Sequence, residues 1–328
     1  MGLPLQARLL VRSNAEKFYK INHFGFISFV WLKSTKITSN PIKKISTNLP
    51  MAIITLTTDF GEKDHFAGAI KGAIYSEQPE VKIVDISHSI SPFNISEAAY
   101  IIQNAYSSFP KGTIHVIGID SELNKENKHI AVKLDDHYFI CANNGIMSMI
   151  CSKIAPEKIV EINIHDKIET SFPVLDVFVK VAGHIARGGT LEVIGKTIDT
   201  IKPIKNLIPF VNDEKNQIIG NVIYIDNYGN VVTNIRKKFF EDIQKGRSFE
   251  ISARNYKFKT VFSKYSDIVN FDIEEDKRND EGKALVVFNS SKYLEIAIYK
   301  SNTTTVGSAS TLMGLTMMDT VTINFNNV

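Results

Sequence analysis

Short apolar runs alternate with helical patterns from Met51 to about Arg187, and this alternation limits the fold more than any other feature of the sequence. It predicts βαβ units, so we expect an α/β N-terminal domain with a largely parallel sheet flanked by helices on both faces. The strand-like runs are Ala52–Thr58, Val81–Ile86, Thr113–Ile119, Ile130–Leu134, His137–Ala142 and Lys158–Ile162. The helical patterns cover Asp64–Glu77, Glu97–Ser108, Gly145–Ile154 and Asp176–Ala186.

The pattern changes after Gly188 and Gly189. Several short β-type runs then follow, a spacing that is typical of a small barrel or sandwich, and only Lys237–Gln244 predicts a helix. We therefore expect an α/β domain over residues 51–189, an irregular linker over 190–216 and a smaller all-β, barrel-like C-terminal domain over 217–328. The β-type runs are Ile218–Ile225, Val231–Ile235, Ser248–Ile251, Phe258–Phe262, Ala284–Phe288, Leu294–Tyr299 and Thr320–Phe325.

Residues 1–50 differ in composition from the rest of the chain, because they hold eight Lys or Arg against Glu16 alone. Met51 stands directly before the first strand-like run, so we expect translation to begin there and residues 1–50 to be a disordered or non-native extension. A basic targeting leader is the alternative. The longest apolar run of this segment, Phe24–Leu32, is too short for a bilayer span of about 20 residues, so we expect no membrane partner.

Charge and cysteine content exclude several classes of function. Outside residues 1–50 the chain has 30 basic and 34 acidic residues, so nucleic acid is not an expected partner. Cys141 and Cys151 lie in apolar stretches, which argues against a disulfide framework or a cysteine metal site and favours a cytoplasmic location. The sequence also lacks the G-x-G-x-x-G, G-x-x-x-x-G-K-[ST], G-x-S-x-G and H-E-x-x-H motifs, and its histidines have no ligand spacing.

Acidic and amide side chains follow several predicted strands. Asp59 ends the first strand-like run, with Asp64 shortly after it, and a carboxylate at this point of a parallel sheet faces the crevice where ligands bind. Two such carboxylates suit the vicinal hydroxyls of a ribose, although Asp59 could equally cap the following helix. Asp120 and Asn144 end two further runs and are expected to converge on the same ligand. His88 either lines this crevice or is a hydrogen-bonded structural histidine.

The β-rich half contains two further polar clusters. Asp226, Tyr228 and Asn230 lie within one predicted turn, where they could bind an amino acid head group and stack on a purine. A hairpin turn of the Asn-Gly type explains the same residues. The second cluster, Asn289 and Ser290 with Glu295 shortly after, has the same two explanations.

Taken in order, these motifs resemble the S-adenosyl-L-methionine (SAM) hydroxide adenosyltransferase family, whose relatives are the adenosyl fluoride and chloride synthases. The resemblance covers nearly all of the chain from Met51 to Val328 and includes motifs in both halves. The segments that carry it are Thr57–Gly61 with Asp64 and Gly68, Asp85–His88 with Pro92 and Phe93, Gly112 and Thr113 before Asp120, Asn144 and Gly145, Asp226–Asn230 with Thr233–Ile235, and Asn289 and Ser290 with Leu294–Ala297.

The resemblance implies that water or hydroxide attacks the ribose C5′ of SAM and releases adenosine and L-methionine. SAM is then the substrate, and neither a metal nor a cofactor is expected. The resemblance also implies a homotrimer that holds its ligand between the α/β domain of one subunit and the barrel of its neighbour.

The family's site roles can be assigned to residues of this sequence that match its motifs. The resemblance implies that Asp59 holds the ribose hydroxyls and that Asp64 supports it. It also implies that Tyr228 lies against the adenine. The methionine part would be received by Asp226, Asn230 and Ser290, and Asn144, Asn289 and Glu295 complete the expected substrate-binding set.

The water-activating residues depart from the pattern of the hydrolytic members. Asp120 matches, but Asn127 stands where those members have an Arg, and Pro173 stands where they have a His. We expect Asp120, Asn127 and Lys128 to form the catalytic set, with Lys128 or His129 as substitutes for the missing Arg, although neither has its planar fork. The alternatives are a catalytically quiet adenosyl-binding relative, a halide-using transferase, and an unrelated α/β protein with a barrel.

Overall fold

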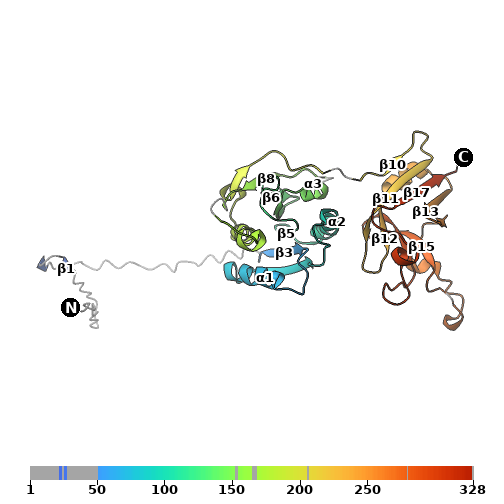
Figure 1. The fold of residues 1–328 in the computed structure, drawn as a ribbon, viewed down its shortest axis with the longest axis horizontal. Coiled ribbons are helices and arrows are strands. Elements are labelled where there is room, and N and C mark those ends of the chain that lie inside the picture. Colours follow the sequence, from blue (N-terminus) through green and yellow to red (C-terminus); the bar gives the residue numbers. More distant parts are fainter. Residues whose placement is uncertain are drawn as a thin grey trace, which may run out of the picture. The chain divides into compact units, whose positions relative to one another are not determined.

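The computed structural model describes residues 22–23, 26–27, 51–151, 154–164, 168–204, 207–278 and 280–326. By its contacts the chain divides into two units, Met1–Asn48 and Leu49–Val328. In the first unit only a two-stranded hairpin is described, β1 (Asn22–His23) with β2 (Phe26–Ile27). The expectations for the rest of residues 1–50 lie outside the described residues. The second unit contains two sheets, one mixed and one antiparallel (Figure 1).

The first sheet has the strand order β4-β3-β5-β7-β6-β8-β9. The four neighbouring strands β4, β3, β5 and β7 run parallel to one another. The pairs β7–β6, β6–β8 and β8–β9 are antiparallel. The expectation of a largely parallel sheet is therefore only partly correct. The strands are β3 (Ile53–Thr58), β4 (Lys82–Ser87), β5 (Ile114–Gly118), β6 (His129–Leu134), β7 (His137–Ala142), β8 (Lys158–Ile162) and β9 (Gly195–Thr197).

The reversal of β6 follows from its connection to β7. Only Asp135 and Asp136 separate the two strands, and both have positive φ angles, 51° and 58°. Two successive residues with positive φ make the tight turn of an antiparallel hairpin, whereas parallel neighbours need a crossover of a dozen or more residues. Aspartate adopts a positive φ more readily than most other non-glycine residues do.

Helices cover both faces of this sheet, as the alternation predicts (Figure 1). On one face α1 (Phe66–Glu77) packs with α4 (Val179–Ala186), which continues a π-helical turn at Val174–Phe178. On the other face α2 (Ile95–Ala105) packs with α3 (Ile146–Ile150). The start of α2 is fixed by Asn94, whose side-chain oxygen accepts from the Glu97 backbone N–H at 3.1 Å.

The second sheet is antiparallel in all its strand pairs, with the order β14-β13-β17-β11-β12-β16-β15 and with β10 added beside β11. It forms the expected barrel-like layer around a core that includes Ile218, Val286 and Ile323. Its strands are β10 (Phe210–Val211), β11 (Gln217–Ile225), β12 (Val231–Arg236), β13 (Phe249–Ala253), β14 (Tyr256–Phe258), β15 (Ala284–Phe288), β16 (Tyr293–Ile298) and β17 (Thr320–Phe325).

Several predicted boundaries differ from the structure. The strand expected at Phe258–Phe262 ends at Phe258, and the segment expected to be an irregular linker contains β9, β10 and a 3₁₀ turn at Leu191–Val193. The helix α5 (Lys237–Gln244) has its predicted bounds, whereas the one-turn α6 (Ala309–Leu312) was not predicted. One turn is too short for a 3.6-residue periodicity to stand out.

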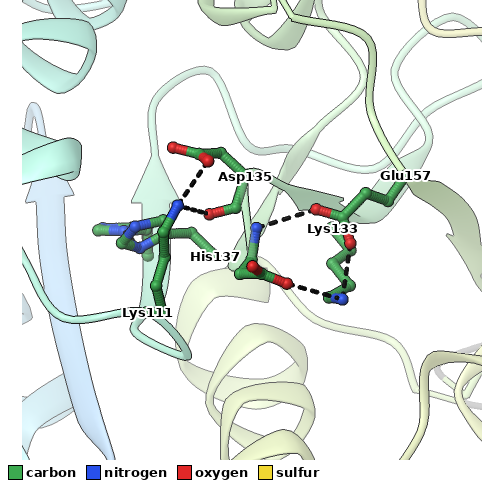
Figure 2. Close-up of polar contacts among 7 residues, drawn as sticks. Lys111, Lys133, Asp135, His137 and Glu157 are labelled. Atoms are coloured by element: carbon green, nitrogen blue, oxygen red, sulfur yellow. Dashed lines mark hydrogen bonds and ion pairs between the residues drawn. The ribbon is translucent and has the colours of Figure 1, made fainter.

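Three buried polar side chains, Thr55, His115 and His137, form a row across strands β3, β5 and β7 of the first sheet. The Thr55 hydroxyl lies 2.7 Å from His115 Nδ1, and His115 Nε2 lies 3.2 Å from His137 Nδ1. Figure 2 shows the surface beside His137, where Lys111 donates to the side chain and backbone oxygen of Asp135. Burial lowers the pKa of His115 to about 3, with a further contribution from His137. His115 is therefore neutral in the folded protein at pH 7.

This burial predicts acid sensitivity of the fold. Unfolded His115 binds a proton below its ordinary pKa of about 6.5, but folded His115 does so only near pH 3, so stability falls as the pH drops from 6.5 toward 3. We expect His115 to contribute about 2.5 kcal/mol to the loss of unfolding free energy between pH 7 and pH 4.5. His115→Phe with Thr55→Val, which leaves no hydroxyl unpartnered, should flatten this dependence in urea unfolding curves.

The matched control is Phe139→Leu, which removes a ring stacked on His115 but no titrating group. It should lower the unfolding free energy by a similar amount at every pH. An unchanged slope in the His115→Phe, Thr55→Val variant would contradict the assignment.

Candidate functional site

Asp59 and Asp120 meet at one edge of the first sheet. They follow β3 and β5, which are parallel neighbours in the register Thr58 opposite Gly118. Burial raises the pKa of Asp59, the hydrogen bond from the Phe93 N–H lowers it, and the negative charge of Asp120 raises it further. The structure thus brings together two carboxylates that the sequence predicted at a common crevice.

The Asp59 carboxylate is held by a loop and does not cap α1. Its Oδ2 accepts from the Phe93 backbone N–H at 2.8 Å, and the cap position of α1 is taken by His65. The capping alternative is therefore wrong. Phe93 has a φ of 61°, an unfavourable conformation for a large side chain, and its ring is 72% exposed. Strained, exposed residues of this kind concentrate at ligand sites.

Asp64 and His88 differ in how firmly they are held. Asp64 is exposed, and within the described ranges it makes no hydrogen bond or ion pair, so its support of Asp59 stays a prediction. His88 is buried, and its Nδ1 lies 2.7 Å from the Thr58 hydroxyl, which matches the structural alternative. It ties the loop after β4 to the end of β3.

Asp120 is held through the loop that leads from β5 back to β6. Its Oδ2 accepts from Asn127 Nδ2 at 3.2 Å, and Asn127 is only 9% exposed. Asn144 Nδ2 donates to the Ile119 carbonyl at 2.9 Å, which fixes the strand end just before Asp120. Asp120, Asn127 and Asn144 therefore lie together at this edge, as the sequence predicts.

The cation beside this group is not one of those proposed from sequence. Lys202, from the segment after β9, places its Nζ 3.3 Å from Asn127 Oδ1. Lys128 is exposed, and no contact of its side chain is seen among the described residues, whereas His129 is buried with its Nε2 2.9 Å from the Ser121 carbonyl. Pro173 lies at the start of the π-helical turn. Sequence reasoning missed Lys202 because it lies 75 positions from its partner.

In the second sheet, Asp226 folds the turn between β11 and β12. Its Oδ1 accepts from the backbone N–H groups of Tyr228 and Asn230 at 2.9 and 2.8 Å, and its Oδ2 accepts from Asn230 Nδ2 at 3.0 Å. The hairpin-turn explanation is thus correct for its geometry. Tyr228, 65% exposed at the tip, remains available for a ligand, and its ligand role stays a prediction.

A cavity of about 490 Å³ opens beside this turn and is lined by Asp226, Asn289, Ser290 and Glu295. Glu295 is 3% exposed and accepts from Tyr265 OH at 2.6 Å and from Asn289 Nδ2 at 3.0 Å. Burial raises the pKa of Glu295, and these two hydrogen bonds lower it. Tyr265 was not singled out in the sequence, because an isolated Tyr in a polar loop carries no signal of its partner.

The predicted site residues thus form two groups. The strand-end group is Asp59, Asp120, Asn127 and Asn144, and the barrel group is Asp226, Asn230, Asn289, Ser290 and Glu295. Among the described residues of this single chain, no hydrogen bond or ion pair joins one group to the other. The described part of the chain also contains no cluster of three or more His, Cys, Asp or Glu side chains that could hold a metal ion.

Fold and site together define a two-sheet protein, α/β followed by an antiparallel barrel, with acidic and amide side chains gathered at an edge of the first sheet and in a cavity of the second. Residues 54–195 match the SAM hydroxide adenosyltransferase N-terminal domain, and residues 220–322 match the C-terminal domain of the same family. The chain therefore belongs to the SAM hydroxide adenosyltransferase family, which confirms the resemblance seen in its motifs.

Individual relatives agree with this membership. The chain is 30% identical to the (R)-S-adenosyl-L-methionine hydrolase of Methanocaldococcus jannaschii, over 83% of this chain and 95% of that protein. It is 25% identical to a fluorinase of Nocardia brasiliensis, over 61% of this chain and 77% of the relative. The crystal structure of an uncharacterized conserved protein from Thermotoga maritima superposes with a TM-score of 0.70 at 27% identity and covers 84% of this chain and all of that one.

No helix in the described part of the chain has both the length and the apolar character needed to cross a membrane.

The turn that carries Asp226 depends on Gly229. Its φ is 73°, and a Cβ there would lie 2.1 Å from the Ser308 hydroxyl oxygen. We expect Gly229→Ala to lower the unfolding free energy by about 2–3 kcal/mol, because it combines a left-handed backbone with a clash. Gly229→Ala with Ser308→Gly removes the contact with Ser308 but leaves the Thr303 methyl group 2.8 Å from the new Cβ, so it should recover part of this loss, beyond the effect of Ser308→Gly alone. Chemical denaturation of the four proteins measures both steps; equal losses in both backgrounds would contradict the clash.

Proposed function

We propose that this protein hydrolyses SAM by attack of water at the ribose C5′ and forms adenosine and L-methionine. The observation that carries the proposal is the pair Asp59 and Asp120. They lie 61 positions apart in the sequence, and the pairing of β3 with β5 brings them to one edge of the sheet. Family membership and the hydrolase named among the relatives support the same chemistry.

The two carboxylates have different tasks in this reaction. Asp59, fixed by the Phe93 N–H, accepts hydrogen bonds from the ribose hydroxyls and so places C5′. Asp120 keeps Oδ2 on Asn127 and offers Oδ1 to the attacking water. The C5′–O bond forms as the C5′–S bond breaks. The electron pair of the broken C5′–S bond passes to sulfur, and methionine leaves as a neutral thioether. Asp120 accepts the proton that the new hydroxyl releases and passes it to solvent.

The barrel group supplies the rest of the substrate site in this proposal. Asp226, Asn230 and Ser290 receive the methionine part, Tyr228 lies against the adenine, and Asn289 with Glu295 shapes the cavity wall. Because the two groups make no direct contact within the described part of one chain, we propose that a homotrimer joins the strand-end group of one subunit to the barrel group of its neighbour.

One observation favours a second candidate, a catalytically quiet adenosyl-binding protein or a halide-using transferase. Asn127 and Pro173 stand where the hydrolytic members have Arg and His, so the water receives fewer direct hydrogen bonds. Loss of a positioned acid or base typically costs about 10²–10⁴ in rate.

Product analysis separates these candidates. Incubation of the purified full-length chain with SAM in ¹⁸O-labelled water should yield adenosine and L-methionine in equal amounts, with the label in the adenosine 5′-hydroxyl. Binding of SAM in calorimetry without product formation would indicate the quiet protein. A 5′-halogenated adenosine formed in chloride or fluoride buffer would indicate the transferase.

Asp59→Asn should weaken adenosine binding by about 1–3 kcal/mol, at least several-fold in Kd. The carboxylate has two oxygens that accept hydrogen bonds from the ribose hydroxyls, whereas the amide has one oxygen that accepts and a nitrogen that only donates. Isothermal titration calorimetry measures this change. Asp199→Asn, which neutralises an exposed carboxylate after β9, is the matched control and should bind as the unmodified protein does. Equal affinity of Asp59→Asn and the control would remove Asp59 from the ribose site.

A further inference from the structure

The segment between the two sheets is fastened to the edge that carries Asp120. The Lys202 backbone N–H donates to Asn143 Oδ1 at 2.8 Å, and the Ile204 N–H donates to the Ser148 hydroxyl at 3.0 Å. Pro203 follows Lys202 directly, and a residue before proline is restricted to extended conformations. The Lys202 side chain therefore starts from a fixed backbone beside the loop after β7.

The Lys202 ammonium is directed to the amide that holds Asp120. Its Nζ lies 3.3 Å from Asn127 Oδ1 and 3.5 Å from the Glu126 carbonyl. The other end of the same amide, Nδ2, donates to Asp120 Oδ2 at 3.2 Å. A cation accepts no hydrogen bond and an ionised carboxylate donates none, so both charges require the same orientation of the Asn127 amide. A flipped amide would lose both hydrogen bonds at once.

We propose that Lys202 is a positioning residue for the hydrolytic step, which acts on Asp120 through the Asn127 amide. This inference rests on the function proposed above. The row Lys202–Asn127–Asp120 fixes one carboxylate oxygen and leaves the other to orient the attacking water. The ammonium also offsets part of the negative charge that Asp59 and Asp120 bring to the same edge. The Asn127 amide, which is buried in an otherwise mostly exposed loop, thereby transmits the effect of a cation whose own side chain lies at the surface.

The test is the steady-state kinetics of adenosine release by full-length variants. Lys202→Met should lower kcat by about 10–100-fold, because misplacement of a reacting group can cost up to about 10² in rate, with KM changed less than about threefold. Lys202→Arg keeps a cationic donor and should retain kcat within about threefold. Lys196→Met, an exposed lysine on β9, is the control and should behave as the unmodified protein.

A double-mutant cycle tests whether the effect passes through Asn127. In the Asn127→Ala background, Lys202→Met should cause little further loss of kcat, because the amide that transmits its effect is already gone. Full additivity of the two losses, or an unchanged kcat in Lys202→Met alone, would overturn the inference while leaving hydrolysis intact.

A second readout does not need turnover. With ¹⁵N-labelled asparagine, the Asn127 side-chain amide signal is assigned by its loss in Asn127→Asp. It should shift in Lys202→Met and stay in place in Lys196→Met. If the unmodified protein releases no adenosine, the proposed function fails, and this signal still decides whether Lys202 holds the amide. An unshifted signal overturns that contact.

Discussion

The parallel pairing of β3 with β5 is the constraint on which the strand-end group depends. In its register, the residues that follow the two strands emerge at the same edge, so Asp59 and Asp120 lie close enough for one charge to act on the other. Two carboxylates that share an edge repel each other unless each is held by donors. A backbone N–H does this for Asp59, and the Asn127 amide does it for Asp120.

The antiparallel direction of β6 completes this arrangement. Because β5 ends at the edge and β6 begins there, the loop between them leaves and returns at the same place, and Asn127 comes back to Asp120. A parallel β6 would begin at the opposite edge of the sheet. The departure from the expected parallel sheet is thus the feature that assembles the Asp120 site.

Sequence patterns predicted the local elements well and the long-range partners poorly. Strand-like runs such as Ile130–Leu134 and the helix at Lys237–Gln244 depend on neighbouring residues, which a pattern records. The direction of β6 depends on two aspartates in left-handed turn conformations, which are rarer than the Asn-Gly pair that signals such a turn. The contacts of Lys202 with Asn127 and of Tyr265 with Glu295 join distant segments, so nothing in the local sequence marks them.

The loop from β5 to β6 has its two ends anchored on strands that both pair with β7, and Asp59 does not belong to it. Its residues can therefore change while the strand pairing that places Asp59 stays as it is. Replacement of residues 119–128 as a unit would change the groups around Asp120 without altering the strand pairing that places Asp59.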